Sequence, residues 1–292
     1  MQQSADTAPV APLGRAVLVG LIGSAIQASR TPALHEREAA ELGLRCIYQL
    51  IDLDVIGLGV EALPELLIAA RRLGFAGVNI THPCKQAIIP LLDELAPDAR
   101  SVGAVNTVVF AGKRAIGHNT DWWGFAESFK SDLADVARAR VVQFGAGGAG
   151  AAVSHALLTL GVEELAIVDV ETDRAARLAA DLVQRFGAGR AVVPTAVDAA
   201  VAVSDGIVNT TPMGMAKYPG MPLPAEWLQE RHWVADIVYF PLETALLKAA
   251  RARGCRTMDG GGMAVFQAVG AFQLFTGIAP DAARMRRHFE RM

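Results

Sequence analysis

The stretch "ARVVQFGAGGAGAAVSHALLTLG", residues 139–161, contains the feature of the sequence that decides the fold. Its residues 140–144 run directly into Gly145-x-Gly147-x-x-Gly150, and an alanine-rich apolar segment follows the last glycine. That order predicts a buried strand, a tight turn and a helix, which together bind a dinucleotide in many α/β proteins. The pattern therefore favours a Rossmann domain over a glycine-rich turn that binds nothing.

Each glycine of this turn has its own physical reason. The first allows the tight turn, the second lets the backbone approach a pyrophosphate, and the third lets the helix pack against the strand. The N-terminus of the helix would then hold the phosphates through its free N–H groups. The predicted cofactor-binding residues of the turn are Gly145, Gly147, Gly148 and Gly150.

Asp169 lies at the end of the next predicted strand, "ELAIVDV" at residues 164–170, roughly twenty residues after the turn. A carboxylate here accepts hydrogen bonds from the ribose hydroxyls of NAD and repels the 2′-phosphate of NADP. NAD is therefore the predicted cofactor, and NADP is less favoured. Arg174 and Arg177 lie downstream and would accommodate NADP only if this loop folded toward the phosphate.

Alternating strands and helices fill the rest of the chain, so the fold class is α/β with a largely parallel sheet. We expect strands at residues 16–22, 46–52, 77–81, 104–110, 191–197, 205–211 and 232–239, and helices at residues 31–43, 62–74, 86–95, 122–135 and from about residue 259. A hairpin turning at Ala111-Gly112 would add antiparallel strands to the first sheet. Residues 1–120 are predicted as a substrate-binding domain with a leader at residues 1–14, residues 121–256 as a Rossmann domain that binds NAD, and residues 257–292 as helices that return to the first domain.

Composition limits the class of partner. The chain has 292 residues, 52% apolar content and a net charge of −3, without the basic stripe that nucleic acid requires. The apolar segment at residues 15–26 is too short to span a membrane. The three cysteines lack CxxC spacing and the histidines lack partners at metal-ligand spacing. We therefore expect a cytoplasmic monomer or homodimer that binds a small molecule and no metal.

Lys85 raises a separate question within "VNITHPCKQAIIPLL", residues 78–92. It lies between a proline and the start of the predicted helix, where a positive charge opposes the helix dipole. Helix stability therefore does not explain this residue, and a function in a site does.

Several separated motifs resemble the shikimate dehydrogenase family, including its NAD-dependent quinate/shikimate branch. They are "SRTPALHE", "NITHPCK", "GAVNT", "GHNTD", "NTTPMGM", "DIVYFP" and "GGMAVFQA", and they follow the family's order over about residues 18–277. The resemblance implies an oxidoreductase that holds a cyclic polyhydroxy carboxylic acid on the first domain and NAD on the second. The implied reaction is the reversible oxidation of shikimate to 3-dehydroshikimate, with quinate as a second candidate substrate.

The same resemblance implies a role for each matching residue. It makes Lys85 and Asp121 the catalytic pair at the C3 oxygen of the substrate. Substrate binding is implied for Ser29, Thr31, Thr81, Asn106, Tyr239 and Gln267, and cofactor binding for Thr210, Met213, Gly260 and Met263 beside the glycine turn and Asp169. NADP-dependent members typically have Asn-Arg-Thr where this chain has Asp169-Val170-Glu171, so the arginine that would bind a 2′-phosphate is absent and NAD is favoured.

Alternatives stay open at this point. Lys85 and Asp121 either exchange the hydroxyl proton as acid and base, or Lys85 stays charged and polarises the carbonyl, or the two form only a structural salt bridge. Thr31 would also suit a helix N-cap. For the whole chain, the rivals are a dehydrogenase of an amino-substituted shikimate or quinate analogue and a non-catalytic module that senses a dinucleotide.

Overall fold

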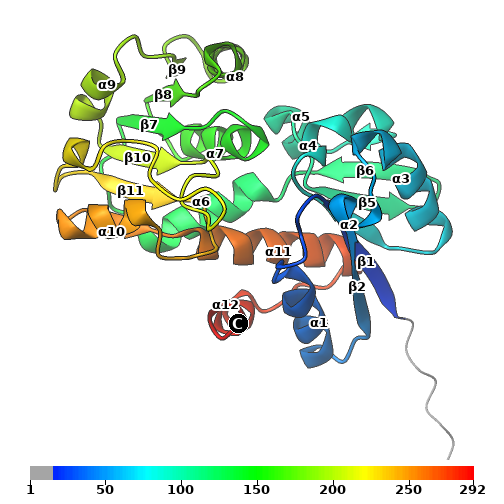
Figure 1. Ribbon diagram of the computed structural model, residues 1–292. Helices are drawn as coiled ribbons and strands as arrows, with labels where there is room; N and C mark the ends of the chain where they lie inside the picture. Colours follow the sequence, from blue (N-terminus) through cyan, green and yellow to red (C-terminus); the bar gives the residue numbers. More distant parts are fainter. Residues whose placement is uncertain (1–15) are drawn as a thin grey trace, which may run out of the picture.

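The computed structural model describes residues 16–292, which form two six-stranded sheets connected by helices α6 (Asp121–Asp132) and α11 (Gly260–Thr276) (Figure 1). The predicted leader at residues 1–14 lies outside the described residues. Among the helices of residues 16–292, none combines the length and the hydropathy that a bilayer crossing demands. The predicted α/β class with two sheets is confirmed.

The first sheet has the strand order β2-β1-β3-β5-β6-β4. Its strands are β1 (Val17–Gly23), β2 (Cys46–Asp52), β3 (Gly77–Ile80), β4 (Glu94–Leu95), β5 (Thr107–Ala111) and β6 (Arg114–His118). β1 pairs in parallel with β2 and β3, whereas β5 runs antiparallel to β3 and β6, as predicted. The hairpin turns one residue later than predicted, at Gly112 and Lys113, because Ala111 still pairs with Arg114 and Gly112 takes a φ of 63°.

Helices around this sheet bury its apolar face. They are α1 (Thr31–Glu41), α2 (Leu53–Ile56), η1 (Val60–Ala62), α3 (Leu63–Arg72), α4 (Cys84–Ala87), η2 (Ile89–Leu91) and α5 (Pro97–Val102). Leu63 and Leu67 of α3 belong to one buried cluster with Ile22, Val78 and Ile80 of the strands. Each fully buried side chain of this kind contributes about 1.5–3 kcal/mol, so α3 is held by packing on the sheet.

One predicted element of this half is wrong. Residues 86–95 were expected to form one helix, but the chain has the single turn α4, the 3₁₀ turn η2 and then strand β4. Pro90 lies inside the expected helix, where it has no N–H to donate and its ring clashes with the preceding turn. Glu94 and Leu95 instead pair with β6, which is a long-range contact that local sequence does not reveal.

The second sheet is entirely parallel, with the strand order β12-β11-β10-β7-β8-β9. Its strands are β7 (Arg140–Phe144), β8 (Glu164–Val168), β9 (Ala191–Val192), β10 (Gly206–Asn209), β11 (Trp233–Asp236) and β12 (Arg256–Met258). Helices α7 (Gly148–Thr159), α8 (Thr172–Phe186), α9 (Val197–Val203), η3 (Ala225–Trp227) and α10 (Ala245–Ala252) connect them. Numbered from β7, this is the order 3-2-1-4-5-6 of a Rossmann domain, whose ligand crevice opens beside β7 and β10.

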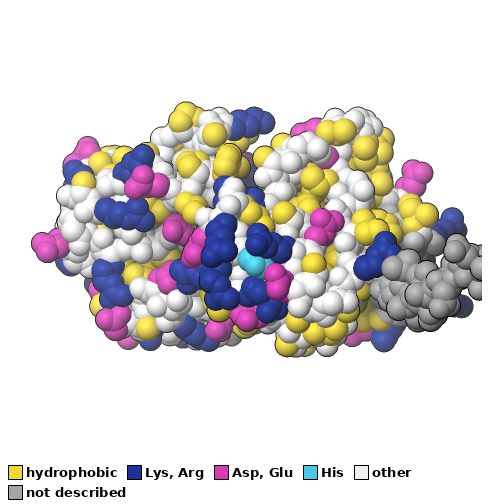
Figure 2. Space-filling model, turned by 90° about the horizontal axis from the view of Figure 1, so that it is seen from below, with side chains coloured by type: hydrophobic (Ala, Val, Ile, Leu, Met, Phe, Trp, Pro, Cys, Tyr) yellow, Lys and Arg dark blue, Asp and Glu magenta, His cyan; other side chains and the backbone are white. Residues whose placement is uncertain are grey.

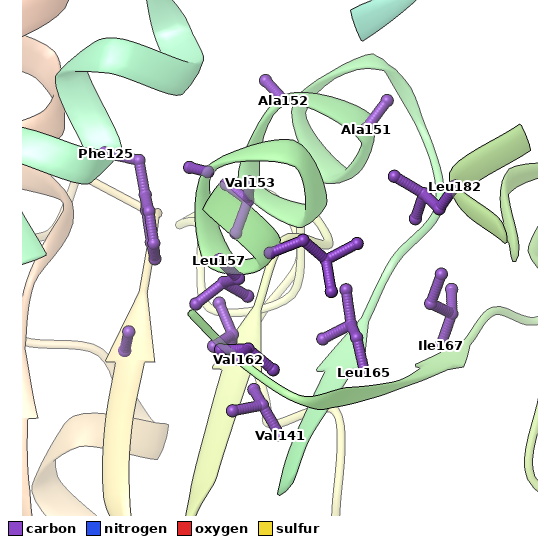
Figure 3. Close-up of a cluster of buried hydrophobic side chains, with 14 of the residues drawn as sticks. Phe125, Val141, Ala151, Ala152, Val153, Leu157, Val162, Leu165, Ile167 and Leu182 are labelled. Atoms are coloured by element: carbon purple, nitrogen blue, oxygen red, sulfur yellow. The ribbon is translucent and has the colours of Figure 1, made fainter. Parts of the chain in front are cut away.

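The core of this second half forms around α7 (Figure 3). Leu157 packs among Val141 of β7, Leu165 of β8 and Phe125 of α6, all of them buried. Because α7 is covered on several sides, it is alanine-rich and apolar all round. Strand β9 is shorter than the predicted strand at residues 191–197, since the chain leaves the sheet before Pro194 and α9 begins at Val197.

The C-terminal helices pack back on the first half, as predicted. Ala271 and Phe275 of α11 belong to one buried cluster with Val19 and Leu21 of β1. Helix α12 (Ala282–Glu290) lies beside α1, and Figure 2 shows Lys and Arg side chains gathered around a histidine on this lower face. The exact domain boundaries at residues 120 and 256 stay a prediction.

Candidate active site

Lys85 and Asp121 are in direct contact. Lys85 Nζ lies 2.6 Å from Asp121 Oδ2, although the two residues are 36 positions apart. Lys85 belongs to the short turn α4 that follows β3, and Asp121 is the first residue of α6. Their side chains are only 19% and 8% exposed, so the pair is shielded from water but reachable from one side. The structure thus brings together the two residues that the motifs predicted as catalytic.

Asp121 is held from several directions. Asn106 Nδ2 donates to Asp121 Oδ1 over 2.8 Å. Asn119, the residue before the N-cap Thr120, accepts at Oδ1 from the backbone N–H of Asp121 (3.0 Å) and of Trp122 (3.3 Å) and so satisfies two free N–H groups in the first turn of α6. Sequence reasoning did not assign this role to Asn119, although asparagine is known to bind the backbone two residues further along in an Asx-turn. Asn119 and the Asn106 amide together fix the position of the carboxylate.

Ser29 and Thr31 lie at the N-terminus of α1, after β1. Ser29 Oγ accepts from the Thr31 backbone N–H (3.3 Å), and Arg30 takes the N-cap position without a side-chain bond to the helix. The alternative that Thr31 is the N-cap is therefore wrong, because Thr31 is already the first helical residue. Its hydroxyl and the dipole of α1 both favour an anion at this point.

Asp52 shapes the loop that leads to these residues. Its carboxylate accepts from the backbone N–H groups of Ala25 (3.1 Å) and Ile26 (3.0 Å) and from Gln27 Nε2 (3.0 Å). Burial raises the pKa of Asp52, but these hydrogen bonds outweigh burial and hold the pKa below its usual range. The sequence analysis did not single out Asp52, whose place at the end of β2 was the available signal.

Tyr239 lies in the loop after β11, in the second half of the molecule. Burial of its phenol raises the pKa of Tyr239, while Lys85 lowers and Asp121 raises the same pKa through their charges. The residue is 41% exposed, and its contact with substrate stays a prediction. The Arg30 guanidinium lies over the neighbouring Phe240 ring at 5.5 Å, which links the α1 loop to the same segment.

Thr81 and Gln267 are the remaining substrate-binding residues that the motifs predicted. Thr81 follows β3, and its carbonyl accepts from Cys84 N (2.7 Å) at the start of α4. Gln267 lies on α11, where Nε2 donates to the Ala264 carbonyl (3.0 Å). Both side chains are partly exposed. Their contact with substrate stays a prediction.

The glycine turn fits a dinucleotide. Gly145 has a φ of 102°, which only glycine adopts without strain, and a Cβ on Gly150 would lie 2.4 Å from the Gly145 carbonyl oxygen. A Cβ on Gly147 would meet no atom of the described residues within 4 Å, so this edge is open for a phosphate. A Cβ on Gly148 would lie 3.6 Å from Lys85, which places the turn directly beside that side chain.

Asp169 directly follows β8, and its carboxylate is bound by the protein itself. Its oxygens accept from Ala146 N (2.8 Å) and Glu171 N (2.9 Å). Arg174 makes ion pairs with both Asp169 (3.5 Å) and Glu171. Arg174 thus lies near the predicted ribose site, but two carboxylates already neutralise it.

The other predicted cofactor residues differ in their burial and in their contacts within the protein. Thr210 donates its hydroxyl to the Phe144 (2.8 Å) and Gly145 carbonyls (2.9 Å), so it braces the turn. Met213 is 37% exposed on the loop after β10. Gly260 and Met263 are both buried at the start of α11, where a Cβ on Gly260 would lie 2.4 Å from the Ile237 carbonyl oxygen. Their cofactor contacts stay a prediction.

Within the described range, no three His, Cys, Asp or Glu side chains come together to hold a metal ion.

Comparisons with known proteins agree with this geometry. Residues 21–108 match the model of the shikimate dehydrogenase substrate binding domain, and residues 260–288 match that of the shikimate 5′-dehydrogenase C-terminal domain. The chain is 60% identical to a shikimate dehydrogenase (NADP(+)) of Streptomyces avermitilis, over 92% of this chain and 93% of that protein. It is 49% identical to a quinate/shikimate dehydrogenase (NAD(+)) of Corynebacterium efficiens, over 94% of this chain and 97% of that protein.

A solved structure gives the same result. The quinate dehydrogenase from Corynebacterium glutamicum in complex with NAD superposes with a TM-score of 0.89 at 46% identity, over 95% of this chain and 99% of that chain. The prediction that this chain is an enzyme is confirmed, and the non-catalytic alternative is set aside. Sequence motifs, fold and relatives agree that the chain belongs to the shikimate dehydrogenase family of oxidoreductases.

Proposed function

We propose that this dehydrogenase oxidises shikimate reversibly to 3-dehydroshikimate, with NAD as the preferred cofactor. The observation that carries the proposal is the Lys85–Asp121 pair at 2.6 Å, directly beside the glycine turn at Gly148. Hydride transfer between an alcohol carbon and a nicotinamide needs a proton-transfer group at the alcohol oxygen and a cofactor held alongside. The short distance between Lys85 and Gly148 supports the assignment of both functions to one site.

The residues of the chain suit the proton half of this reaction. Oxidation of the alcohol removes one hydride from carbon and one proton from oxygen. Bound NAD supplies the hydride acceptor. Lys85, entering the step as the free amine, takes the proton of the substrate hydroxyl and becomes an ammonium that stays hydrogen-bonded to Asp121 until it releases the proton on its exposed side. In the reverse direction the Lys85 ammonium polarises the carbonyl and returns the proton.

The α1 loop suits the substrate carboxylate. The Ser29 and Thr31 hydroxyls, the N-terminus of α1 and the nearby Arg30 all favour a negative charge at this point. Relatives named for shikimate and for quinate support this class of cyclic acid. We propose quinate as a second substrate; an amino-substituted analogue of either acid remains the alternative, since it would present the same carboxylate.

The cofactor preference rests on the loop after β8. Asp169 and Glu171 add two carboxylates to the loop that we propose to face the 2′ position of the cofactor, and Arg174 is already paired with both. This arrangement disfavours NADP through charge repulsion. The relatives divide on this point, because the 60% identical protein is named for NADP and the corynebacterial proteins for NAD. The charge balance of the loop favours NAD.

A matrix of initial rates tests the proposal: shikimate and quinate, each with NAD and with NADP, at one pH. We expect turnover of shikimate with NAD at a higher kcat/KM than with NADP. Turnover of quinate as well would add the second substrate. A preference for NADP would overturn the assignment of Asp169, and turnover only in a panel of amine-bearing analogues would favour the alternative substrate.

The setting of the enzyme is part of the same proposal. Cys46, Cys84 and Cys255 are free thiols, which suits the reducing environment of the cytoplasm. We propose a monomer or a homodimer, and sedimentation at assay concentration distinguishes the two.

A further inference from the structure

A row of hydrogen bonds crosses the first sheet and ends at Asp121. The Tyr48 hydroxyl donates to Asn79 Oδ1 (2.7 Å), and Asn79 Nδ2 donates to Thr107 Oγ1 (2.9 Å). The Thr107 hydroxyl donates in turn to Asn106 Oδ1 (3.1 Å). Asn106 Nδ2 then donates to Asp121 Oδ1 (2.8 Å), so every bond of the row runs toward the carboxylate.

The row is closed to water. Tyr48 and Asp121 are each 6% exposed, Asn79 is 4%, Asn106 is 3% and Thr107 is 0% exposed. Polar atoms buried in this way must find their partners within the protein. The direction of each hydrogen bond is therefore decided by the chemistry of its neighbours.

That chemistry allows only one arrangement around Thr107. The Asn79 amide nitrogen carries only hydrogens, so Thr107 Oγ1 accepts from it and turns its own hydrogen toward Asn106 Oδ1. The backbone N–H of Thr120 also donates to Asn106 Oδ1 (2.8 Å). Because two donors face this oxygen, the amide cannot flip, and its NH₂ group must face Asp121.

We infer that Thr107 is a positioning residue for the proposed reaction. Its hydroxyl, oriented by Asn79 and Tyr48, holds the Asn106 amide, and the amide holds one oxygen of Asp121 while the other oxygen faces Lys85. This inference rests on the proposed function. Both hydrogens of the Asn106 amide already have acceptors, Asp121 Oδ1 and Thr120 Oγ1 (2.9 Å). Loss of the Thr107 hydroxyl therefore reaches the reaction through the orientation of Asp121.

Two variants of Thr107 separate the hydroxyl from the packing. Thr107→Val keeps the shape and removes the hydroxyl, whereas Thr107→Ser keeps the hydroxyl. We expect kcat for shikimate oxidation to fall about tenfold in Thr107→Val, the effect of about one hydrogen bond. KM for shikimate should rise by less than kcat falls, and Thr107→Ser should recover most of kcat. Tyr48→Phe acts one bond further away and should lower kcat by a smaller factor.

Thr276→Val is the matched control, because its hydroxyl donates to the Phe272 carbonyl at the end of α11 and joins no bond of this row. It should leave kcat and KM unchanged, and thermal melting shows whether each variant is folded at the assay temperature.

A wild-type kcat in folded Thr107→Val, or a loss of kcat in Thr107→Ser equal to that in Thr107→Val, would overturn the inference. If Thr107→Val does not fold, Tyr48→Phe decides, since an unchanged kcat there contradicts the row. Absence of wild-type turnover with shikimate would instead refute the proposed function.

Discussion

At the scale of single residues, the proposed chemistry depends on the ammonium group of Lys85. Lys85→Met keeps the length of the side chain and removes the charge and its hydrogen bond to Asp121. General acid–base groups contribute about 10²–10⁴-fold to rate, so we expect kcat for shikimate to fall by that order. NAD affinity, measured by quenching of tryptophan fluorescence, should change little.

The control for this variant is Lys130→Met on the exposed side of α6, where, within residues 16–292, the lysine forms an ion pair only with Glu127. It should have wild-type kcat. Turnover close to wild type in Lys85→Met would mean that the pair is a structural salt bridge, which was one of the alternatives that the sequence left open.

At the scale of elements, the loop from β8 to α8 decides the cofactor. The triple variant Asp169→Asn, Val170→Arg, Glu171→Thr removes two carboxylates and places a cation on a side chain that is 99% exposed in this chain. It also releases Arg174 from both ion pairs. We expect the ratio of kcat/KM for NAD to that for NADP to fall at least about tenfold, equivalent to about 1.4 kcal/mol.

Asp173→Asn is the control, because this carboxylate lies in the first turn of the same helix but makes no ion pair among the described residues. Its cofactor ratio should equal that of the wild type. An unchanged ratio in the triple variant would show that the loop does not discriminate between the two dinucleotides.

Elements with a local cause were predictable from the sequence. The strand, glycine turn and helix from Arg140 onward follow from a strict local pattern, and the structure has them where they were expected. The prediction of a helix at residues 86–95 was wrong for two reasons. It gave the apolar pattern of the segment more weight than Pro90, and the pairing of β4 with β6 depends on residues about twenty positions away in the sequence. The Lys85–Asp121 contact was predictable only through a family motif. The row from Tyr48 to Asn106 was not, since its order depends on how β2, β3 and β5 lie in the sheet.

At the scale of the whole molecule, the buried ring of His35 packs between elements from the first and the last parts of the chain. His35 lies on α1, and the centroid of its ring is 5.0 Å from that of Tyr48 of β2 and 5.8 Å from that of Phe272 of α11. The residue is 1% exposed, and Nε2 has no hydrogen-bond partner within residues 16–292. Burial lowers the pKa of His35 to about 3. The folded protein therefore keeps this ring neutral where the unfolded chain, with a pKa of about 6.5, takes up a proton.

This difference makes stability depend on pH with a definite sign. Above pH 6.5 both states are neutral at His35 and the residue has no effect on the slope. As the pH falls from 6.5 toward 3, the unfolded state binds one more proton than the folded state, so the free energy of unfolding decreases by about 1.4 kcal/mol per pH unit. His155, whose pKa burial lowers to about 4, adds to the same slope over a narrower range.

His35→Phe tests this assignment, because the surrounding ring contacts accept an aromatic side chain that cannot titrate. The free energy of unfolding is measured in urea at pH 7.5, 6.0 and 5.0. We expect it to decrease less steeply with falling pH in the variant than in the wild type, and the two slopes should differ by the contribution of about one bound proton. His82→Phe, at an exposed position, should keep the wild-type slope. Equal slopes in His35→Phe and wild type would mean that the contact between α1 and α11 opens to let His35 charge while the rest of the molecule stays folded.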